Sequence, residues 1–205
     1  MVYPLTDWPL IDPTSAEGLK AVFYQVFVGV LMGILLQIVN AALIIGGQAV
    51  SASMGLSMAN MVDPSMGNVP VIAQFFVICS TLIFLGLGGH VLVISLLLES
   101  FELLPINSAL DLQGLLKLTI EWSAMMFVGA ILIGLPLMAS LLFINIGLGV
   151  ITRTAPALNI FAVGFPAMIL AGIVLLSLSM TSIGYRIQWL WQESFEIIGQ
   201  ALGIR

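Results

Sequence analysis

The sequence contains four long stretches without a single Asp, Glu, Lys or Arg, at residues 21–62, 64–98, 122–152 and 154–185. Each is longer than the roughly 20 residues that a helix needs to cross a bilayer. Within lipid every backbone N–H and C=O must be bonded inside the protein, so these stretches are either helices or strands of a closed barrel. Barrel strands alternate apolar with polar residues, and runs such as residues 69–87 do not. We therefore predict an all-α integral membrane protein.

The composition argues against a soluble enzyme. Apolar residues make up 60% of the 205 and charged residues only 7%, whereas roughly a quarter of an ordinary soluble domain is charged. The single Cys79 has no disulfide partner, and the sequence offers neither a cysteine pair nor a second histidine to bind a metal. We find no nucleophile beside a base, no phosphate-binding glycine loop and no basic patch for nucleic acid. Neither catalysis nor a cofactor is expected.

Glycine and proline interrupt the uncharged stretches. Residues 86–90 read GLGGH, and each glycine costs about 1 kcal/mol in a helix interior relative to Ala, so we predict a kink or break there. Pro136 removes one helical hydrogen bond and bends its helix unless neighbours compensate. The first helix should end near Gly46 and Gly47. The predicted architecture is about four long apolar segments plus short half-helices, with bent and broken helices as the recurring feature; the family resemblance described below implies that they pair as hairpins.

The segment that follows those two glycines differs from the other runs. Residues 48–61 read QAVSASMGLSMANM, in which small residues alternate with Met54, Met58 and Met61 at helical spacing. Small residues let helices approach closely, and methionine adapts to varied shapes. We interpret this segment as a helix or half-helix buried against protein, and leave open whether its methionines pack or gate.

By composition the chain divides into three parts. Residues 1–20 form an exposed N-terminal segment, which in a longer protein would follow upstream helices, and Thr14 or Ser15 is expected to cap the first helix. Residues 21–185 form the membrane-embedded domain. Residues 186–205 form an amphipathic C-terminal helix. Its apolar face comprises Ile187, Leu190, Trp191, Phe195, Ile198, Ala201 and Leu202.

Two isolated ionisable residues are candidates for function. His90, the only histidine, follows two glycines in an apolar run, and either bonds the broken backbone or takes part in a relay or metal site that has no evident companion. Arg153 interrupts more than sixty otherwise uncharged residues, so it lies either in a loop at the membrane surface or against a carboxylate of a partner subunit. Gly29 and Gly33 form a GxxxG pattern that favours close helix contact.

Three ordered motifs resemble those of the FliR family, flagellar biosynthetic membrane proteins of the bacterial type III export apparatus. They are MGLSMANMVDP at residues 54–64, GGHVLVISLLLESFELLPI at residues 88–106 and TRTAPALNIFAVGFP at residues 152–166. The last is the most specific, because related injectisome subunits diverge from its NIFAVGFP portion. The likeness covers nearly the whole chain from Lys20 onward. FliR-like proteins usually begin with a further apolar helix or two and often carry an aromatic residue where Met58 stands here.

The resemblance implies a core subunit of the flagellar protein export gate, in the bacterial inner membrane at the flagellar basal body. Such a gate is made with FliP-like and FliQ-like subunits next to an FlhB-like protein, and unfolded flagellar proteins pass through it. By position, residues 55–68 match a loop that helps to plug the closed channel. The residues assigned to this plug loop are Met58, Met61, Asp63, Pro64 and Asn68. Structural or interface roles are expected for Gly89, His90, Arg153, Pro156, Asn159, Phe161, Gly164, Phe165 and Pro166.

Three alternatives remain at this point. An injectisome export-gate subunit would share the architecture. A small-molecule transporter would hold ions at the ends of broken helices, but it needs two repeated halves, and we find no internal repeat. An intramembrane enzyme would need a polar side chain facing His90 at mid-membrane.

Overall fold

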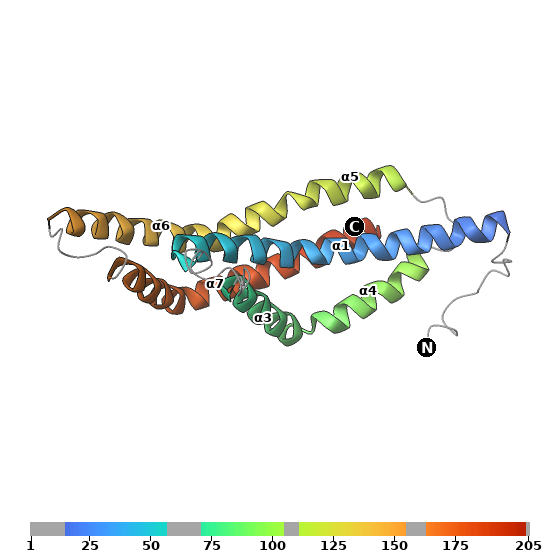
Figure 1. Ribbon diagram of the computed structural model, residues 1–205. Coiled ribbons are helices and arrows are strands. Elements are labelled where there is room, and N and C mark those ends of the chain that lie inside the picture. Colours follow the sequence, from blue (N-terminus) through green and yellow to red (C-terminus); the bar gives the residue numbers. More distant parts are fainter. Residues whose placement is uncertain (1–14, 57–70, 105–110, 155–162, 204–205) are drawn as a thin grey trace. The chain divides into compact units, whose positions relative to one another are not determined.

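The computed structural model describes residues 15–56, 71–104, 111–154 and 163–203, and every regular element within these ranges is a helix (Figure 1). The helices are α1 (Ala16–Ser53), α3 (Val71–Gly86), α4 (Gly89–Leu103), α5 (Leu112–Ser123), α6 (Met125–Thr154) and α7 (Phe165–Ala201). The prediction of an all-α integral membrane protein is confirmed.

Three helical stretches are long and apolar enough to cross a membrane. They are α1, the run of α5 and α6, and α7, with α3 and α4 together as a fourth, broken candidate. With 38 residues, α1 is about 57 Å long at 1.5 Å per residue, well beyond the roughly 30 Å of a hydrocarbon core. α1 is therefore longer than a single perpendicular bilayer crossing requires.

Side-chain caps begin two of the helices. Gly18 N donates to Ser15 Oγ at 3.0 Å, and Glu17 places a negative charge in the first turn of α1. Gly114 N donates to Asp111 Oδ1 at 3.0 Å at the start of α5. The cap expected near the start of the first helix is thus confirmed at Ser15.

The predicted end of the first helix near Gly46 and Gly47 is wrong. α1 runs without interruption to Ser53 and takes in the first residues of the segment expected to form a second helix. A glycine costs helix stability on its own, but the missing side chain permits close packing that offsets this cost. α6 is likewise one helix across Pro136.

The chain forms two compact units, each assembled from separate parts of the sequence. Unit 1 comprises Met1–Val39, Phe84–Met125 and Leu190–Arg205, and unit 2 comprises Asn40–Ile83 and Met126–Trp189. Fully buried side chains in unit 1 include Leu35, Leu190 and Ile198. Those in unit 2 include Leu43, Phe76, Ile133 and Leu141.

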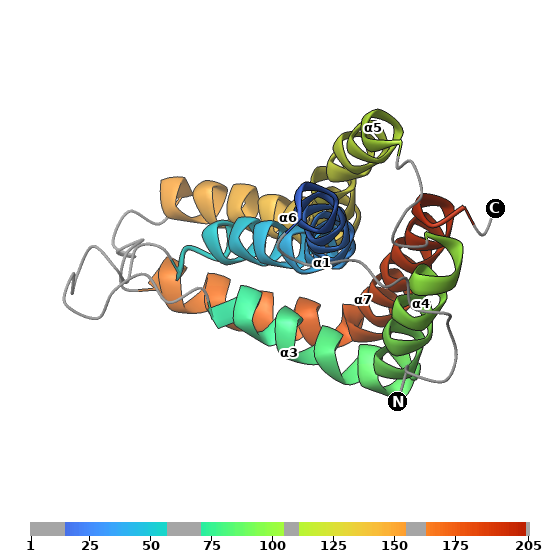
Figure 2. The same cartoon turned by 90° about the vertical axis from the view of Figure 1, so that its right-hand side faces the viewer.

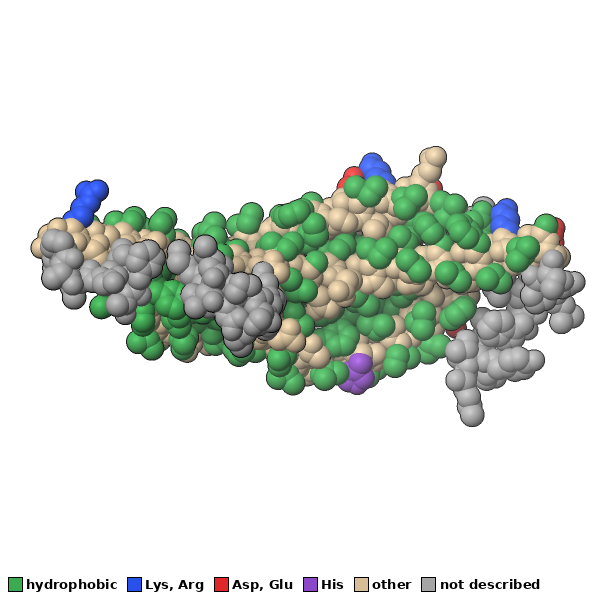
Figure 3. Space-filling model, in the orientation of Figure 1, with side chains coloured by type: hydrophobic (Ala, Val, Ile, Leu, Met, Phe, Trp, Pro, Cys, Tyr) green, Lys and Arg blue, Asp and Glu red, His purple; other side chains and the backbone are tan. Residues whose placement is uncertain are grey.

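Large hydrophobic side chains also cover the outside, as Figure 3 shows for one face. Each helix exposes at least one such residue by half or more, including Val26, Leu82, Ile94, Ile120, Phe143 and Leu178. A soluble monomer rarely exposes so much apolar surface, which marks contact with lipid or with other proteins.

Candidate functional site

The structure offers sites built by packing rather than by reactive groups. Within the described ranges, no group of three or more His, Cys, Asp or Glu side chains lies close enough together to hold a metal ion. The most constrained places are glycine positions where two helices touch. They are concentrated in unit 2, at the C-terminal part of α1, close to where the predicted plug loop begins.

In unit 2, α1 meets α3 and α6 through glycines. A Cβ at Gly47 would overlap the backbone of Ala73 in α3. A Cβ at Gly46 would lie 3.1 Å from the carbonyl oxygen of Ala130 in α6, which is tighter than side chains normally pack. Figures 1 and 2 show the C-terminal part of α1 running alongside α6. These contacts explain why α1 continues through its two glycines.

The chain leaves α1 at Met54 and Gly55, where it packs against α7. Met54 is only 1% exposed, and a Cβ at Gly172 of α7 would overlap its side chain. Gly55 has a φ of +80°, in the left-handed region that costs an L-residue about 1–2 kcal/mol. A Cβ there would lie 3.4 Å from the ring of Phe165. The first residues of the predicted plug segment are therefore fixed by the first turns of α7.

Unit 1 contains the predicted break between α3 and α4. Gly88 adopts a φ of +72° and forms the N-cap of α4, which confirms a break at this glycine cluster. A side chain at Gly89 would collide with the ring of Phe84. That ring packs on Trp191 of α7 with 4.6 Å between centroids, and on Phe195 at 6.1 Å. The lack of a side chain at Gly89 thus allows the start of α4 to pack closely against the aromatic cluster of Phe84, Trp191 and Phe195.

His90 follows this break but faces outward. It is exposed, visible as the purple side chain in Figure 3, and makes no hydrogen bond within the part of the chain that the structure describes. The carbonyl of Gly88 instead accepts bonds from the N–H groups of Val91 and Leu92. The expected bond from His90 to the broken backbone is therefore not seen in these ranges.

A second polar feature of unit 1 was missed by reasoning from sequence. The carbonyl oxygen of Leu35 in α1 accepts a hydrogen bond from Trp122 Nε1 of α5 and another from Ser194 Oγ of α7, each at 3.3 Å. Leu35 and Ser194 are fully buried, so the two bonds satisfy buried donors. One backbone carbonyl therefore joins three helices. The available signal was a small polar residue, Ser194, in the middle of the predicted apolar face of the C-terminal helix.

Four residues of that apolar face are buried in unit 1. Leu190, Trp191, Ile198 and Leu202 are all below 6% exposed. This part of the predicted apolar face thus packs within its own chain. In the structure it belongs to the last part of α7 rather than to a separate helix.

The remaining site residues of the sequence prediction fall into two groups. In α7 and just before it, Gly164 is buried, Phe165 is half-buried and Pro166 is exposed, while Arg153 is exposed in the last turn of α6. Met58, Met61, Asp63, Pro64, Asn68, Pro156, Asn159 and Phe161 lie outside the described residues.

Charge separates the two units. The described acidic residues, Glu17, Glu99, Glu102, Asp111, Glu121, Glu193 and Glu196, all lie in unit 1. In unit 2 the charged residues among those described are Arg153 and Arg186. Lys117 and Glu121 of unit 1 form an exposed ion pair, with 3.8 Å between Nζ and Oε1. Unit 2 is thus held by apolar packing in nearly uncharged surroundings.

Comparison with known proteins decides the family. The sequence matches the family described as bacterial export proteins, family 1, over residues 2–194. It is 34% identical over 200 residues to the flagellar biosynthetic protein FliR of Pectobacterium carotovorum subsp. carotovorum, covering 97% of this chain and 76% of that protein. The chain belongs to the FliR family. FliR of Escherichia coli (strain K12) is 34% identical over 201 residues, with the same two shares, and FliR of Aquifex aeolicus is 30% identical over 189 residues, covering 92% of this chain and 73% of that protein.

Family membership confirms the resemblance drawn from the three motifs. It establishes a membrane protein with a role in flagellar export.

Proposed function

We propose that this chain is a core subunit of the flagellar type III export gate in the bacterial inner membrane, at the base of the flagellum. It forms a channel for unfolded flagellar proteins with FliP-like and FliQ-like subunits, next to an FlhB-like protein, and carries out no chemistry of its own. The observation that carries this proposal is the match to FliR proteins over 97% of the chain.

The apolar exterior supports an assembled state. Ile120, Phe143 and Leu178 are each more than 70% exposed, on three different helices. Side chains of this size gain roughly 1.5–3 kcal/mol each when they are buried. Exposed side chains of this kind suit subunits that pack side by side.

We propose the same three-part organisation as in the sequence analysis. Residues 21–185 form the membrane-embedded domain, residues 186–205 form the amphipathic C-terminal part, and residues 1–20 form an exposed segment.

Deleting the gene tests the export role. Cells without this protein should secrete no flagellin, and the plasmid-borne chain should restore secretion, measured by immunoblotting of the culture medium. Normal secretion in the deletion strain would contradict the proposal.

We further propose that residues 55–68 obstruct the channel at rest, through Met58, Met61, Asp63, Pro64 and Asn68. The tight fit of Met54 on Gly172 and the position of Gly55 beside Phe165 support this role, because a plug loop must be held in place where it leaves its helix. Deleting residues 58–68 should leave assembly intact and raise ion leakage through the gate, measured as sodium or proton flux in cells. Gly33→Ala serves as a control that leaves the loop unchanged. An assembled deletion variant with unchanged leakage would remove the plug assignment.

For the residues that were assigned structural or interface roles from the sequence, we propose the following. Asn159 bonds backbone freed near Pro156 or Pro166, Phe161 and Phe165 pack on partner subunits, and Gly164 permits close approach. Gly89 permits the break between α3 and α4, the outward-facing His90 belongs to an interface with a partner, and Arg153 lies at the membrane surface or pairs with a partner carboxylate. Asn159→Leu should then reduce co-purification with the FliP-like and FliQ-like subunits. Normal assembly combined with failed export would instead mean that this segment acts directly in transport.

A further inference from the structure

The chain leaves α1 through a turn that its own backbone specifies. The N–H of Met54 donates to the carbonyl of Val50 at 3.0 Å, as in a helix, and the N–H of Gly55 donates to the carbonyl of Ala52, also at 3.0 Å. Gly55 then adopts a φ of +80°, the left-handed conformation with which glycine commonly ends a helix. The direction in which the chain continues is therefore set once Met54 is in place.

Met54 is held in place by α7. Its side chain is 1% exposed and lies on the buried Gly172, where a Cβ would stand 2.7 Å from Cγ and 2.9 Å from Sδ of Met54. The ring of Phe165 lies 3.4 Å from the position of a Cβ at Gly55. Phe165 and Gly172 are seven residues apart, about two helical turns, and so share one face of α7. One face of α7 thus contacts both residues of the turn.

This contact differs from the other contacts of α1 in unit 2. At Gly46 and Gly47, α1 meets the backbones of Ala130 and Ala73, which cannot rearrange without moving whole helices. At Gly172, the backbone of α7 instead meets a methionine side chain. Methionine is unbranched and has three rotatable bonds, so it can take a second position while both helices stay where they are. The attachment of α1 is therefore rigid before its end and adjustable at its end.

The same contact joins two motifs of the sequence. Met54 and Gly55 begin the motif at residues 54–64, and Phe165 lies near the end of the motif at residues 152–166. Their packing brings together segments that are distant in the sequence, at the point where the chain leaves α1.

We propose that Gly172 and Phe165 are positioning residues of the export gate. By seating Met54 and Gly55, they hold the segment that follows α1 in its resting position, and export requires this contact to be released. The inference rests on the proposed obstruction of the channel by residues 55–68. The gate is then controlled from α7, because a displacement of its first turns frees the segment while α1 stays attached to α3 and α6.

Gly172→Ala tests the resting position. The added methyl group takes the space of the Met54 side chain and displaces it. The assembled gate should therefore leak ions at least about fivefold more than the parent gate, the smallest population shift expected from such an overlap. Leakage is measured as sodium or proton flux in cells, and assembly by co-purification with the FliP-like and FliQ-like subunits. Assembly should be unchanged.

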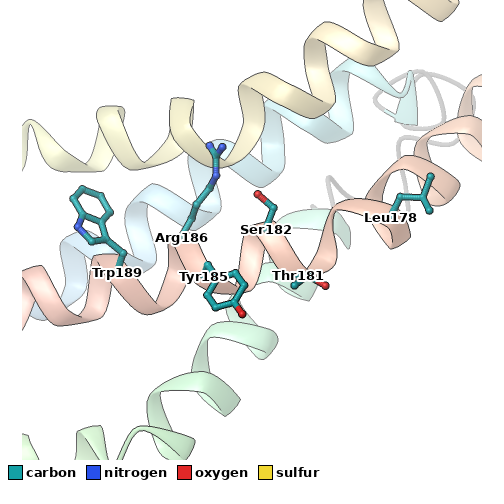
Figure 4. Close-up of a pocket in the computed structure, with 6 residues that line it drawn as sticks. All are labelled: Leu178, Thr181, Ser182, Tyr185, Arg186 and Trp189. Atoms are coloured by element: carbon teal, nitrogen blue, oxygen red, sulfur yellow. The ribbon is translucent and has the colours of Figure 1, made fainter.

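Gly184→Ala is the matched control on the same helix. Nothing lies within 4 Å of the Cβ that it adds. This part of α7 borders an open cavity of about 540 Å³ (Figure 4). The cavity is lined by Leu178, Thr181, Ser182, Tyr185, Arg186 and Trp189. Leakage and assembly of this variant should equal those of the parent gate.

A reversible crosslink tests whether the contact must be released. Met54→Cys and Gly172→Cys are combined with Cys79→Ala, which removes the single native cysteine. A Cβ at residue 172 would lie 2.7 Å from Cγ of Met54, the atom whose place a cysteine sulfur takes, which brings the pair within reach of a disulfide. Oxidation should stop flagellin secretion, and reduction should restore it. The pair sets a smaller side chain opposite the added one, so it also serves if Gly172→Ala does not assemble.

Several results would overturn the inference. They are parent-like leakage in an assembled Gly172→Ala gate, equal leakage in Gly172→Ala and Gly184→Ala, and normal secretion while the disulfide is formed. The deletion of residues 58–68 separates the inference from the plug itself. If the deletion leaks and Gly172→Ala does not, residues 55–68 obstruct the channel but α7 does not position them. If neither leaks, the plug and the inference both fall.

Discussion

Unit 1 and unit 2 differ in the contacts that join α1 to its neighbours. Unit 1 depends on groups that are present, since Trp122 and Ser194 both donate to the carbonyl of Leu35. Unit 2 depends on the lack of side chains at Gly46 and Gly47, which lets α1 pack directly on the backbones of α6 and α3. Unit 1 also carries all of the described acidic residues.

This contrast teaches how each region responds to change. At Gly46 and Gly47 of unit 2, one added methyl group should be harmful because it meets the backbones of Ala130 and Ala73, which cannot move aside as a side chain can. In unit 1, the loss of a donor should be harmful because it leaves a buried polar group unpaired. Four predictions test this contrast, from the largest expected effect to the smallest.

Gly47→Ala should destabilise the protein most. Its Cβ would overlap the Ala73 backbone, and overpacking of this kind costs typically about 1–3 kcal/mol. Gly33→Ala in unit 1 is the matched control, because nothing lies within 4 Å of the Cβ that it adds. The measurement is thermal unfolding of the purified chain in detergent. Equal melting temperatures for the two variants would show that glycine spacing does not hold unit 2 together.

Gly88→Ala tests a glycine of unit 1 that is needed for its backbone conformation rather than for space. At a φ of +72°, an alanine should cost about 1–2 kcal/mol. Gly86→Ala, two residues earlier and within α3, has no neighbour within 4 Å and should be neutral or slightly stabilising. If both variants lose stability equally in the same unfolding assay, the break is not set by the conformation of Gly88.

Trp122→Phe removes one of the two side-chain bonds to Leu35 and should cost about 1 kcal/mol. Ser194→Ala should cost a similar amount. Because both donors share one acceptor, the double variant should depart from additivity by about 0.5 kcal/mol or more. Trp189→Phe alters an indole that has no described hydrogen bond and serves as the control. Strict additivity would mean that the shared carbonyl does not couple the three helices.

Lys117→Gln should have the smallest effect. Both side chains of its ion pair with Glu121 are exposed to solvent, and such pairs contribute about 0.5 kcal/mol or less to the free energy of unfolding. Unfolding at low and high salt should give nearly the same difference from the parent chain. A loss above about 1 kcal/mol would show that the surface charges of unit 1 contribute directly to its stability.

Local sequence rules predicted much of this fold. Uncharged length predicted membrane helices, the residues preceding the first helix predicted the cap at Ser15, and the glycine cluster predicted the break at Gly88. Helical spacing predicted the apolar face that Leu190 and Ile198 bury in unit 1. Each of these features depends on residues within a few positions of one another.

Features that depend on distant neighbours were missed. The end of α1 was predicted too early because Gly46 and Gly47 favour the helix only through close packing on Ala130 and Ala73, which are distant in the sequence. The hydrogen bonds to Leu35 join residues 87 and 159 positions apart, and a backbone carbonyl has no sequence signal. The GxxxG at Gly29 and Gly33 has open space at both glycines within the chain. A small-residue pattern therefore identifies a surface suited to close contact but not its partner.

The central claim is that this FliR-family chain works as a packed subunit of an export gate. The most direct test is co-expression of the tagged chain with the FliP-like and FliQ-like proteins of the same genome, followed by affinity purification and mass measurement in detergent. We predict that all three proteins elute as one complex of defined mass. If the FliP-like and FliQ-like proteins assemble with each other while this chain elutes alone, the account is contradicted.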